Sequence, residues 1–471
     1  MNRILHTICA VSFAAGLAMA AVSARSQEPG SQSPASQPPP AAPQQPSDLA
    51  TVISSEGGAQ TRIAVPDFIA LSGDAETNRI GKAIAEVLFD DLNFEHEFAL
   101  IPRDTYSTIP VARTFDDVPL DRWRELGADA VLVGTVQKTA AGILVQVRLF
   151  DARRPDRRQA GFGGKEYSGS AANPRAYAHA ISDEIHEKQR ALHGVARTKL
   201  TFASDRDGER VGGTVESRSV KEIYISDYDG ANQRRVTTGR SLNIQPNWSP
   251  DARSIAYTSY RNRDGLPNIF ISHIYQGLLD QFPKAPEQSF QPSWSPDGTR
   301  IAFWSTRDGN AEIYVANRDG SNVRRLTDNR GIDQSPTWSP NGTQIAFVSD
   351  RTGTPQVWVM GTDGLGLRKI TSESYADRPT WSPPPYNEIA YTARNGPGFD
   401  IKVIELGSGQ IRQFTFGEGT NESPAWAPNG RHLAFTSTRS GKVQVFVIDR
   451  AGRNLKQITS VGNNEKPDWS K

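Results

Sequence analysis

Cysteine is nearly missing from this chain of 471 residues, in which Cys9 is the only one. Cys9 lies inside an N-terminal stretch with the form of an export signal, so the mature protein is expected to contain no disulfide. An excess of one charge is also missing, because 53 Lys and Arg residues face 52 Asp and Glu residues. A nucleic-acid-binding protein needs a basic face, and this balance argues against that class.

A second long apolar run is missing too, so no later segment is expected to cross a membrane. Residues 1–24 predict a signal peptide with an apolar run from Ile8 to Val22. A membrane anchor is the alternative, but this run is short for a span of about 20 residues. Residues 25–47 are rich in Pro, Gln and Ser and predict an extended linker. We therefore expect a soluble protein of the periplasm.

Familiar catalytic motifs are missing as well. The sequence contains no G-x-S-x-G, H-E-x-x-H, phosphate-loop or dinucleotide-binding pattern. His179, His186 and His193 do recur every seven residues on a predicted helix. Seven-residue steps are about 10 Å apart along a helix, too far for one metal ion, so we expect a helix face packed against another surface. The sequence thus predicts no enzyme, no cofactor and no metal site.

What the sequence does contain is a repeat marked by tryptophan. The marker residues are Trp248, Trp294, Trp338, Trp381, Trp426 and Trp469, with spacings of 46, 44, 43, 45 and 43 residues. Self-similarity with a period of about 40–50 residues is typical of a propeller or a solenoid.

Each repeat predicts four short strands, which we call A to D. Around Trp338, strand A ends at the tryptophan, and Pro340-Asn341-Gly342 forms the tight turn that follows. Strand B begins at Ile345, strand C contains Val357-Trp358-Val359, and strand D ends at Ile370-Thr371. The alternation of apolar and polar residues and the β-branched composition both favour strands.

The number of strands predicts a closed ring. The first set begins with strand B at Leu200 and has no strand A before it, whereas the last strand A, Pro467-Asp468-Trp469, has no strand B after it. We therefore expect the C-terminal strand to complete the first blade of a six-bladed β-propeller over residues 195–471. The copy after Ile271 is expected to have an irregular stretch up to Gln288 instead of a regular strand D.

Residues 48–194 predict a small α/β domain before the propeller. Ser72 or Asp74 is a plausible start cap of its first helix, and Asn173 of its last. The expected elements are a strand at 63–65, a helix over 80–92, a strand at 98–101, a short helix at 120–126, a hairpin of 130–136 with 143–150, a strand around 166–167 and a helix over 174–192.

A set of arginines is the most regular polar feature of the repeat. Each follows a Ser or Thr by two positions at the end of strand B; they are Arg206, Arg261, Arg307, Arg351, Arg394 and Arg439. Six equivalent positions in a ring place six guanidinium groups near one face. Each arginine either pins its own blade through carboxylates or carbonyls, or belongs to a binding rim for an acidic partner.

Topology predicts which face of the propeller can bind a partner. The chain enters the propeller near Lys199, at the start of a strand B, so the small domain is expected to leave from the face that carries the A–B turns. The opposite face carries the B–C and D–A connections, including Gln291, Asp333, Gln334 and Ser335. A propeller face with varied side chains is a protein-docking surface by default.

Three further segments carry a resemblance to a known family. The stretches Gly127–Gly134, Ser182–Lys188 and Ser226–Gln233, together with the repeat and the signal peptide, resemble the TolB family of the Tol–Pal system. The resemblance covers residues 50–471.

This resemblance implies a non-enzymatic role in outer-membrane integrity and cell division. It implies that a Pal-like peptidoglycan-associated lipoprotein binds Gln291, Gln334 and Ser335, with Asp333 beside them. It also implies that an N-terminal arm, Leu49–Gly57, engages a TolA-like inner-membrane protein. We expect a monomer without a membrane span. An exported hydrolase or lyase with its site in the propeller channel, and a carbohydrate-binding propeller, remain alternatives.

Overall fold

The computed structural model describes residues 59–154, 164–210, 220–262, 265–282 and 288–471. The predicted signal peptide with Cys9, the linker and the N-terminal arm lie outside the described residues. Within these ranges, no helix is long and apolar enough to cross a membrane.

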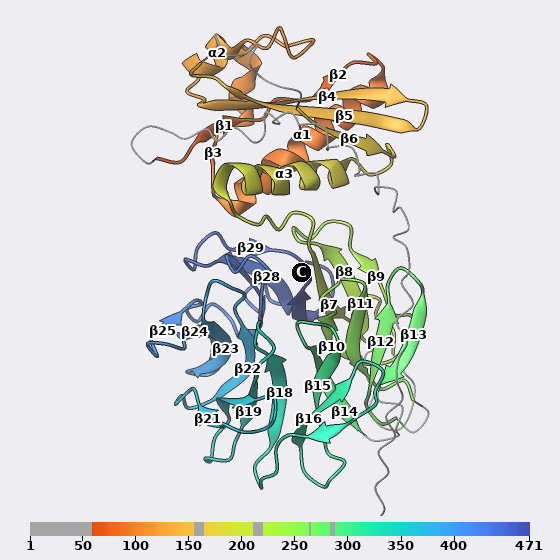
Figure 1. The fold of residues 1–471 in the computed structure, drawn as a ribbon, viewed down its shortest axis with the longest axis vertical. Coiled ribbons are helices and arrows are strands. Elements are labelled where there is room, and N and C mark those ends of the chain that lie inside the picture. Colours follow the sequence, from red (N-terminus) through yellow and green to blue (C-terminus); the bar gives the residue numbers. More distant parts are fainter. Residues whose placement is uncertain (1–58, 155–163, 211–219, 263–264, 283–287) are drawn as a thin grey trace, which may run out of the picture. The chain divides into compact units, whose positions relative to one another are not determined.

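The first folded region is a mixed sheet with the strand order β3-β1-β4-β5-β6, on which β2 also pairs with β4. β1 runs parallel to β3 and β4, whereas β4, β5 and β6 are antiparallel neighbours (Figure 1). The strands are β1 (Arg62–Ala64), β2 (Ile69–Ala70), β3 (Ala99–Leu100), β4 (Ala130–Thr139), β5 (Gly142–Asp151) and β6 (Lys165–Gly169). The expected hairpin of residues 130–136 with 143–150 is therefore confirmed.

Helices cover both faces of this sheet and form two apolar layers. On one face, α1 (Ala75–Glu95) and α3 (Pro174–Arg190) bury side chains such as Leu88 and Ile181 against Leu132 of β4. On the other face, α2 (Leu120–Glu125) and the short 3₁₀ helix η3 (Arg103–Thr108) pack with Trp123 against Val131. The first seven residues of β4, Ala130 to Val136, are buried and include one polar residue, Thr135, because both faces of the sheet are covered there.

The N-terminus of α1 shows how the sequence sets an element boundary. The Asp74 carboxylate accepts hydrogen bonds from the backbone N–H groups of Glu76 and Thr77, at 3.0 Å each, as an N-cap residue does. Asp74 is thus the cap, rather than Ser72. Asn173 precedes α3 at the N-cap position, with Pro174 at the first turn, but its side chain makes no capping hydrogen bond.

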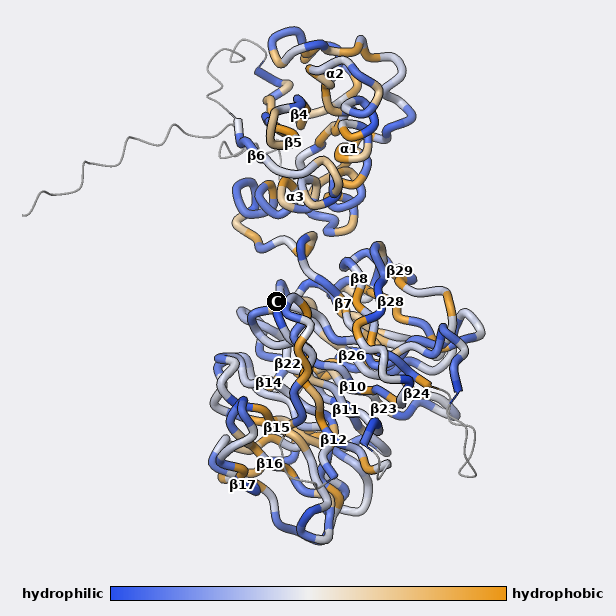
Figure 2. Tube along the Cα trace, turned by 90° about the vertical axis from the view of Figure 1, so that its right-hand side faces the viewer, coloured by the Kyte–Doolittle hydropathy of each residue, from blue (hydrophilic) through white to orange (hydrophobic). Residues whose placement is uncertain are grey.

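Six antiparallel sheets of four strands each follow, and Figure 2 shows apolar residues running along their strands. The predicted six-bladed propeller is confirmed. The innermost strands, each ending at a marker tryptophan, are β10 (Asn243–Trp248), β14 (Ser289–Trp294), β18 (Asp333–Trp338), β22 (Ala376–Trp381), β26 (Asn421–Trp426) and β30 (Asn464–Trp469). Strands B are β7 (Lys199–Ser204), β11 (Ser254–Ser259), β15 (Arg300–Ser305), β19 (Gln344–Ser349), β23 (Glu388–Asn395) and β27 (His432–Ser437).

The outer half of each blade consists of strands C and D. Strands C are β8 (Glu222–Asp227), β12 (Asn268–His273), β16 (Glu312–Asn317), β20 (Gln356–Gly361), β24 (Gly398–Glu405) and β28 (Gln444–Asp449). Strands D are β9 (Arg234–Arg235), β13 (Leu278–Phe282), β17 (Arg324–Arg325), β21 (Arg368–Lys369), β25 (Ile411–Gln413) and β29 (Lys456–Gln457).

The C-terminal strand closes the ring, as the strand count predicted. β30 pairs with β7 in the register Trp469 with Leu200 and Asn464 with Ser204. The indole Nε1 of Trp469 donates to Thr198 Oγ1 at 2.7 Å, and this tryptophan is only 5 % exposed. First and last blades therefore share one sheet, and neither leaves an unpaired edge at the junction.

One expected irregularity is wrong. The blade after Ile271 has a regular strand D: β13 pairs with β12 over five residues, longer than any other strand D that the structure describes. A turn with Gly277 at φ 66° starts this strand, and Phe282 anchors it with 1 % exposure. The sequence of β13 lacks the basic-apolar-Thr phrase of the other copies, so the repeat pattern gave no sign of it.

Candidate partner-binding site

The propeller has two faces with different loops. The A–B face carries the A–B and C–D turns, and the B–C face carries the B–C and D–A connections. The contacts with the α/β domain use the A–B face: the Tyr228 hydroxyl donates to Asp91 of α1 at 2.7 Å, and Arg431 pairs with Glu95. The B–C face lies at the other ends of the same strands, as the entry point near Lys199 predicted.

A buried ionic network joins α1, α3 and the turn after β8. His179 of α3 lies 2.8 Å from Asp91 and 3.7 Å from Asp227. Arg175 bonds to Asp229 at 2.7 Å, beside the same turn. Burial lowers the pKa of His179, but the carboxylates of Asp227 and Asp91 outweigh this effect and raise its pKa to about 9. His179 is therefore a cation at neutral pH, and it packs against another surface as its helical spacing predicted.

Glu95 forms a second buried contact at this junction. It accepts hydrogen bonds from the backbone N–H of Val195, at 2.7 Å, and from Asn429 and Arg431. Burial acts to raise the pKa of Glu95, but the interactions with His186 and with the Arg431 guanidinium outweigh it and lower the pKa. Glu95 is thus a buried carboxylate held ionised by partners from both regions.

The six arginines of the repeat lie on the B–C face and are used within their own blades. Each guanidinium lies over an aromatic ring of its own blade, at 4.4 to 5.3 Å from the nearest centroid. The Nε groups of Arg307 and Arg351 also donate to Ser305 and Ser349, two residues earlier. These contacts lie within each blade, but they use aromatic rings and serine hydroxyls rather than the carboxylates or carbonyls of the first alternative.

The four loop residues predicted to face a partner differ in exposure. Gln291 and Gln334 are half-buried at the B–C face. Ser335 is 5 % exposed, and its hydroxyl donates to Gln291 at 3.2 Å. Asp333 is fully buried and accepts a hydrogen bond from Arg351 at 2.7 Å. Asp333 therefore supports this loop from beneath, whereas Gln291 and Gln334 reach its surface.

A ring of six residues at the channel mouth was not recognised from the sequence, although two of its members, Gln291 and Ser335, were among the residues predicted to face a partner. Each blade has a register shift in strand A, and the residue before its proline has a φ between 50° and 57°. This left-handed conformation is unfavourable outside glycine, yet it recurs in all six blades. The residues are Gln245, Gln291, Ser335, Arg378, Ser423 and Lys466, and together they line a cavity of about 110 Å³ on the channel axis.

Hydrogen bonds link the members of this ring, which we call the mouth ring. Gln245 donates to Gln291 at 3.2 Å, and Arg378 donates to Ser423 at 2.8 Å. The recurring X-Pro-X-Trp phrase was the available sequence signal. It could not be interpreted without knowing that the bulge turns X toward the axis.

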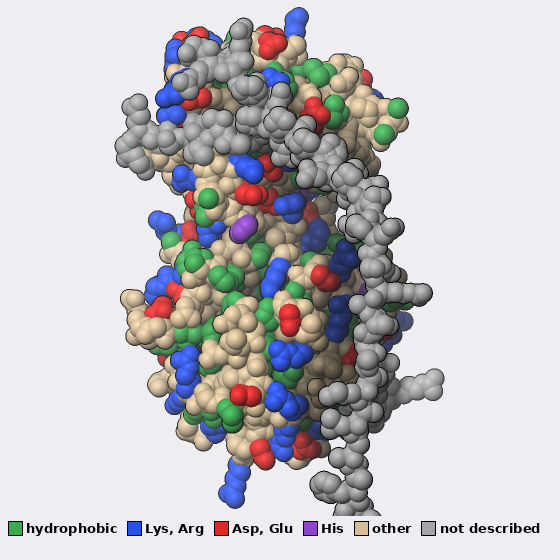
Figure 3. All heavy atoms as spheres, in the orientation of Figure 1, with side chains coloured by type: hydrophobic (Ala, Val, Ile, Leu, Met, Phe, Trp, Pro, Cys, Tyr) green, Lys and Arg blue, Asp and Glu red, His purple; other side chains and the backbone are tan. Residues whose placement is uncertain are grey.

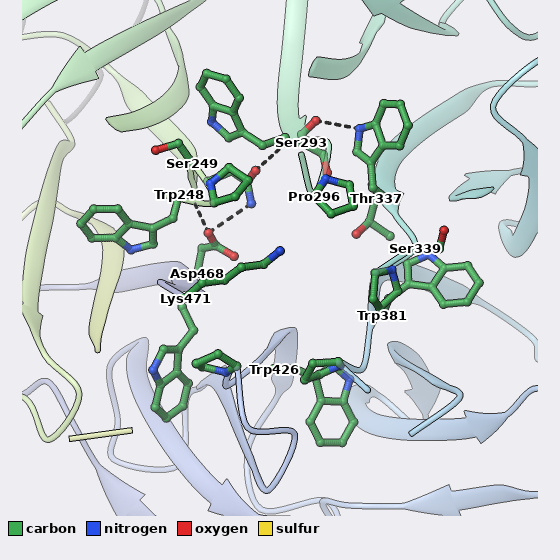
Figure 4. A pocket seen from close by; sticks show the side chains of 18 of the residues that line it. Trp248, Ser249, Ser293, Pro296, Thr337, Ser339, Trp381, Trp426, Asp468 and Lys471 are labelled. Atoms are coloured by element: carbon green, nitrogen blue, oxygen red, sulfur yellow. Dashed lines mark hydrogen bonds between the residues drawn. The ribbon is translucent and has the colours of Figure 1, made fainter. Parts of the chain in front are cut away.

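Deeper in the channel, toward the A–B face, the terminal strand contributes a carboxylate. Asp468 accepts hydrogen bonds from the backbone N–H of Trp248 at 2.7 Å and from Asn247 at 3.1 Å (Figure 4). Burial raises the pKa of Asp468 to about 7. Lys471 lies beside it, at the position where each of the other five blades has a proline two residues after the marker tryptophan. Within the described ranges, no group of three His, Cys, Asp or Glu residues could hold a metal ion.

Two family models match the sequence of this chain. The model of the "TolB beta propeller domain" matches residues 187–471, more than half of the chain, and that of the "TolB amino-terminal domain" matches residues 49–157. The chain belongs to the TolB family.

Two curated relatives are both named Tol-Pal system protein TolB. That of Bordetella avium is 36% identical over 430 residues, which cover 90% of each chain. That of Desulfosudis oleivorans is 34% identical over 267 residues, and the match spans 56% of this chain and 57% of the relative. The crystal structure of TolB from Acinetobacter baumannii has the same fold, with a TM-score of 0.71 and 22% identity, covering 88% of this chain and 97% of that one. This chain is thus a TolB-family protein of the Tol-Pal system.

Proposed function

We propose that this TolB-family protein is a non-enzymatic adaptor in the periplasm. Its B–C face binds a Pal-like peptidoglycan-associated lipoprotein, and its N-terminal arm, Leu49–Gly57, engages a TolA-like inner-membrane protein. By joining the two, it contributes to outer-membrane integrity and cell division. The predicted signal peptide over residues 1–24 supports export to the periplasm.

One observation carries this proposal: the α/β domain contacts the propeller through the A–B face. The B–C face, at the opposite ends of the strands, presents half-buried Gln291 and Gln334 on loops that Asp333, Arg307 and Arg351 brace from within their blades. Rigidly held polar side chains on loops are suited to protein recognition, because little side-chain entropy is lost on binding.

A direct binding measurement tests the proposal. Gln334→Arg should weaken binding of the soluble domain of a Pal-like lipoprotein, measured by isothermal titration calorimetry, by about tenfold, because it places a bulky charge at the surface of the contact. Gln410→Arg is the matched control, since Gln410 is exposed on a C–D turn of the A–B face. Its affinity should equal that of the unmodified protein.

Two results would contradict the adaptor proposal. The unmodified protein could fail to bind any Pal-like lipoprotein, alone or from an envelope extract. Alternatively, Gln410→Arg could weaken binding as much as Gln334→Arg does, which would place the contact on the other face.

A further inference from the structure

Lys466 is a mouth-ring cation whose charge is not neutralised within the described part of the chain. Its side chain is half-buried, and its ammonium group makes no hydrogen bond or ion pair with any described residue. Burying an ammonium group without a partner costs free energy, so such groups are normally paired. Lys466 lines the cavity at the channel mouth, so an anion that enters this cavity meets an ammonium group without a protein partner.

Two carboxylates, Glu465 and Asp377, act on Lys466 through their charge, and both have other partners. Glu465 pairs with Lys221 at 2.8 Å. Asp377 accepts hydrogen bonds from Ser335 at 3.1 Å and from the Tyr375 hydroxyl at 3.2 Å. Both carboxylates raise the pKa of Lys466 through their charge, but neither forms an ion pair with it in the described part of the chain.

A second cation in the same ring adds to this effect. Arg378 donates to Ser423, which lies between Arg378 and Lys466 in blade order. Burial lowers the pKa of Lys466 to about 8, and the positive charge of Arg378 contributes to this decrease. Arg378 also lies 3.7 Å from the carboxylate of Asp377, whereas Lys466 has no such partner among the described residues. The polar cavity of about 110 Å³ leaves space for a carboxylate group beside Lys466.

The rest of the mouth ring is neutral and can only assist with hydrogen bonds. It consists of two glutamines and two serines, and the amide nitrogen of Gln245 already bonds to Gln291. The ring thus has a net positive charge on one side, although the protein as a whole has a formal charge of only +1. Local charge in a concave site, rather than total charge, decides what binds there.

We propose that the channel mouth on the B–C face is a carboxylate-binding site that takes one Asp or Glu side chain of the docked partner, with Lys466 as its counter-ion and Arg378 as the second cation. This inference rests on the proposed function for the identity of the partner. It deepens that function by identifying the anchor of the contact: an acidic side chain inserted on the propeller axis. Central, desolvated charge pairs of this kind contribute more to affinity than charges at the rim.

The repeat supplies a suitable substitution for the test. Lys466→Gln introduces the residue that β10 and β14 carry at the same position and in the same left-handed conformation, so the fold should persist. Binding of the soluble domain of a Pal-like lipoprotein should weaken by tenfold or more. Lys442→Gln, at an exposed lysine on a B–C turn of the same face, should change the affinity less than twofold.

Two further measurements identify the group that is bound. In the first, each Asp or Glu of the lipoprotein is replaced in turn by Asn or Gln. One of these changes should weaken binding to the unmodified protein but should not weaken binding to Lys466→Gln any further. Succinate, added to the unmodified protein with ¹³C-labelled lysine, should shift the Cε resonance of Lys466 and raise its pKa, but leave Lys442 unchanged. The groups that also act on this titration are Arg378, Lys221, Asp377 and Glu465.

The results separate this inference from the proposed function. If the lipoprotein binds the unmodified protein and Lys466→Gln equally well, the carboxylate site is wrong and the adaptor proposal stands. If the lipoprotein does not bind at all, the adaptor proposal fails, and the succinate titration alone decides: a shift confined to Lys466 supports the site, and no shift overturns it.

Discussion

At the scale of single residues, the repeat contains natural variants of the same position. Five residues before the marker tryptophans stand Asn243, Ser289, Asp333, Ala376, Asn421 and Asn464. Asp333 accepts from Arg351 at 2.7 Å, and Asn464 accepts from Arg206 at the same distance. A neutral amide therefore satisfies a B–C-face arginine as well as a carboxylate does.

This comparison predicts two different outcomes at Asp333. Asp333→Asn should change the free energy of unfolding by less than about 1 kcal/mol, because the amide oxygen still accepts from Arg351. Asp333→Ala should cost about 3 kcal/mol, because it leaves a largely buried guanidinium without its partner. Urea denaturation measures both changes. Equal losses for the two variants would mean that the charge of Asp333, rather than the hydrogen bond, stabilises the blade.

At the scale of elements, the junction of α1, α3 and β8 depends on a charged histidine. His179 is 5 % exposed and lies between Asp91 and Asp227, two carboxylates from different elements. Loss of the proton of His179 would remove the cation between Asp91 and Asp227, although Lys199 and Arg175 would still pair with Asp227.

The pKa of His179, about 9, sets a pH window for stability. An unfolded histidine titrates at about pH 6.5, so the stabilisation is fully present below that pH and is lost as the pH rises toward 9. The loss is on the order of 3 kcal/mol. Urea denaturation at several pH values should show a difference between the unmodified protein and His179→Gln that shrinks from about pH 6.5 to about pH 9.

Comparing these two proteins is necessary because other groups titrate nearby. Asp468 and Lys466 have pKa values of about 7 and about 8, and they remain in both proteins. His193→Gln is the control, since the imidazole of His193 is exposed at the end of the same segment. Its pH profile should follow the unmodified protein. A constant difference between His179→Gln and the unmodified protein over the whole range would contradict the assignment.

At the scale of the whole molecule, one strand closes the propeller. β30 joins residues from the two ends of the propeller sequence, with the Lys199 backbone N–H donating to Ser470 Oγ at 2.9 Å. Figure 3 shows basic and acidic side chains interspersed over the visible face. Charge repulsion on this face would therefore not keep two copies apart if a strand edge became unpaired.

Deletion of residues 463–471 should therefore open the ring. The edge of β7 would lose its partner, and an unpaired edge strand favours association between copies. Size-exclusion chromatography should show oligomers or aggregate, and thermal denaturation should show a lower midpoint. Trp469→Phe is the control, because it keeps the backbone pairing and should remain monomeric. A truncated protein that stays monomeric with an unchanged midpoint would disprove the role of β30.

The repeat and its closure were predictable from the sequence, whereas one strand and the burial of one loop residue were not. The period of the tryptophans predicted the blades, and the unmatched strands at Leu200 and Trp469 predicted the closure. β13 was missed because its pattern departs from the repeat, while its pairing depends on β12. The loop residues lie on the face opposite the α/β domain, as the topology predicted, but the contact that Asp333 makes in the interior is with Arg351, a residue 18 positions away in the sequence.

The sequence by itself determined the repeat, the number of blades and the family, because these depend on local periodicity that survives in one dimension. Only the tertiary structure decided which polar residues meet. Lys466 and Arg378 are 88 positions apart, and the bulge before each proline brings both to one mouth. His179 is a cation at neutral pH only because the fold buries it between two carboxylates that are distant in the sequence. Burial and long-range charge depend on distances that the order of residues does not contain.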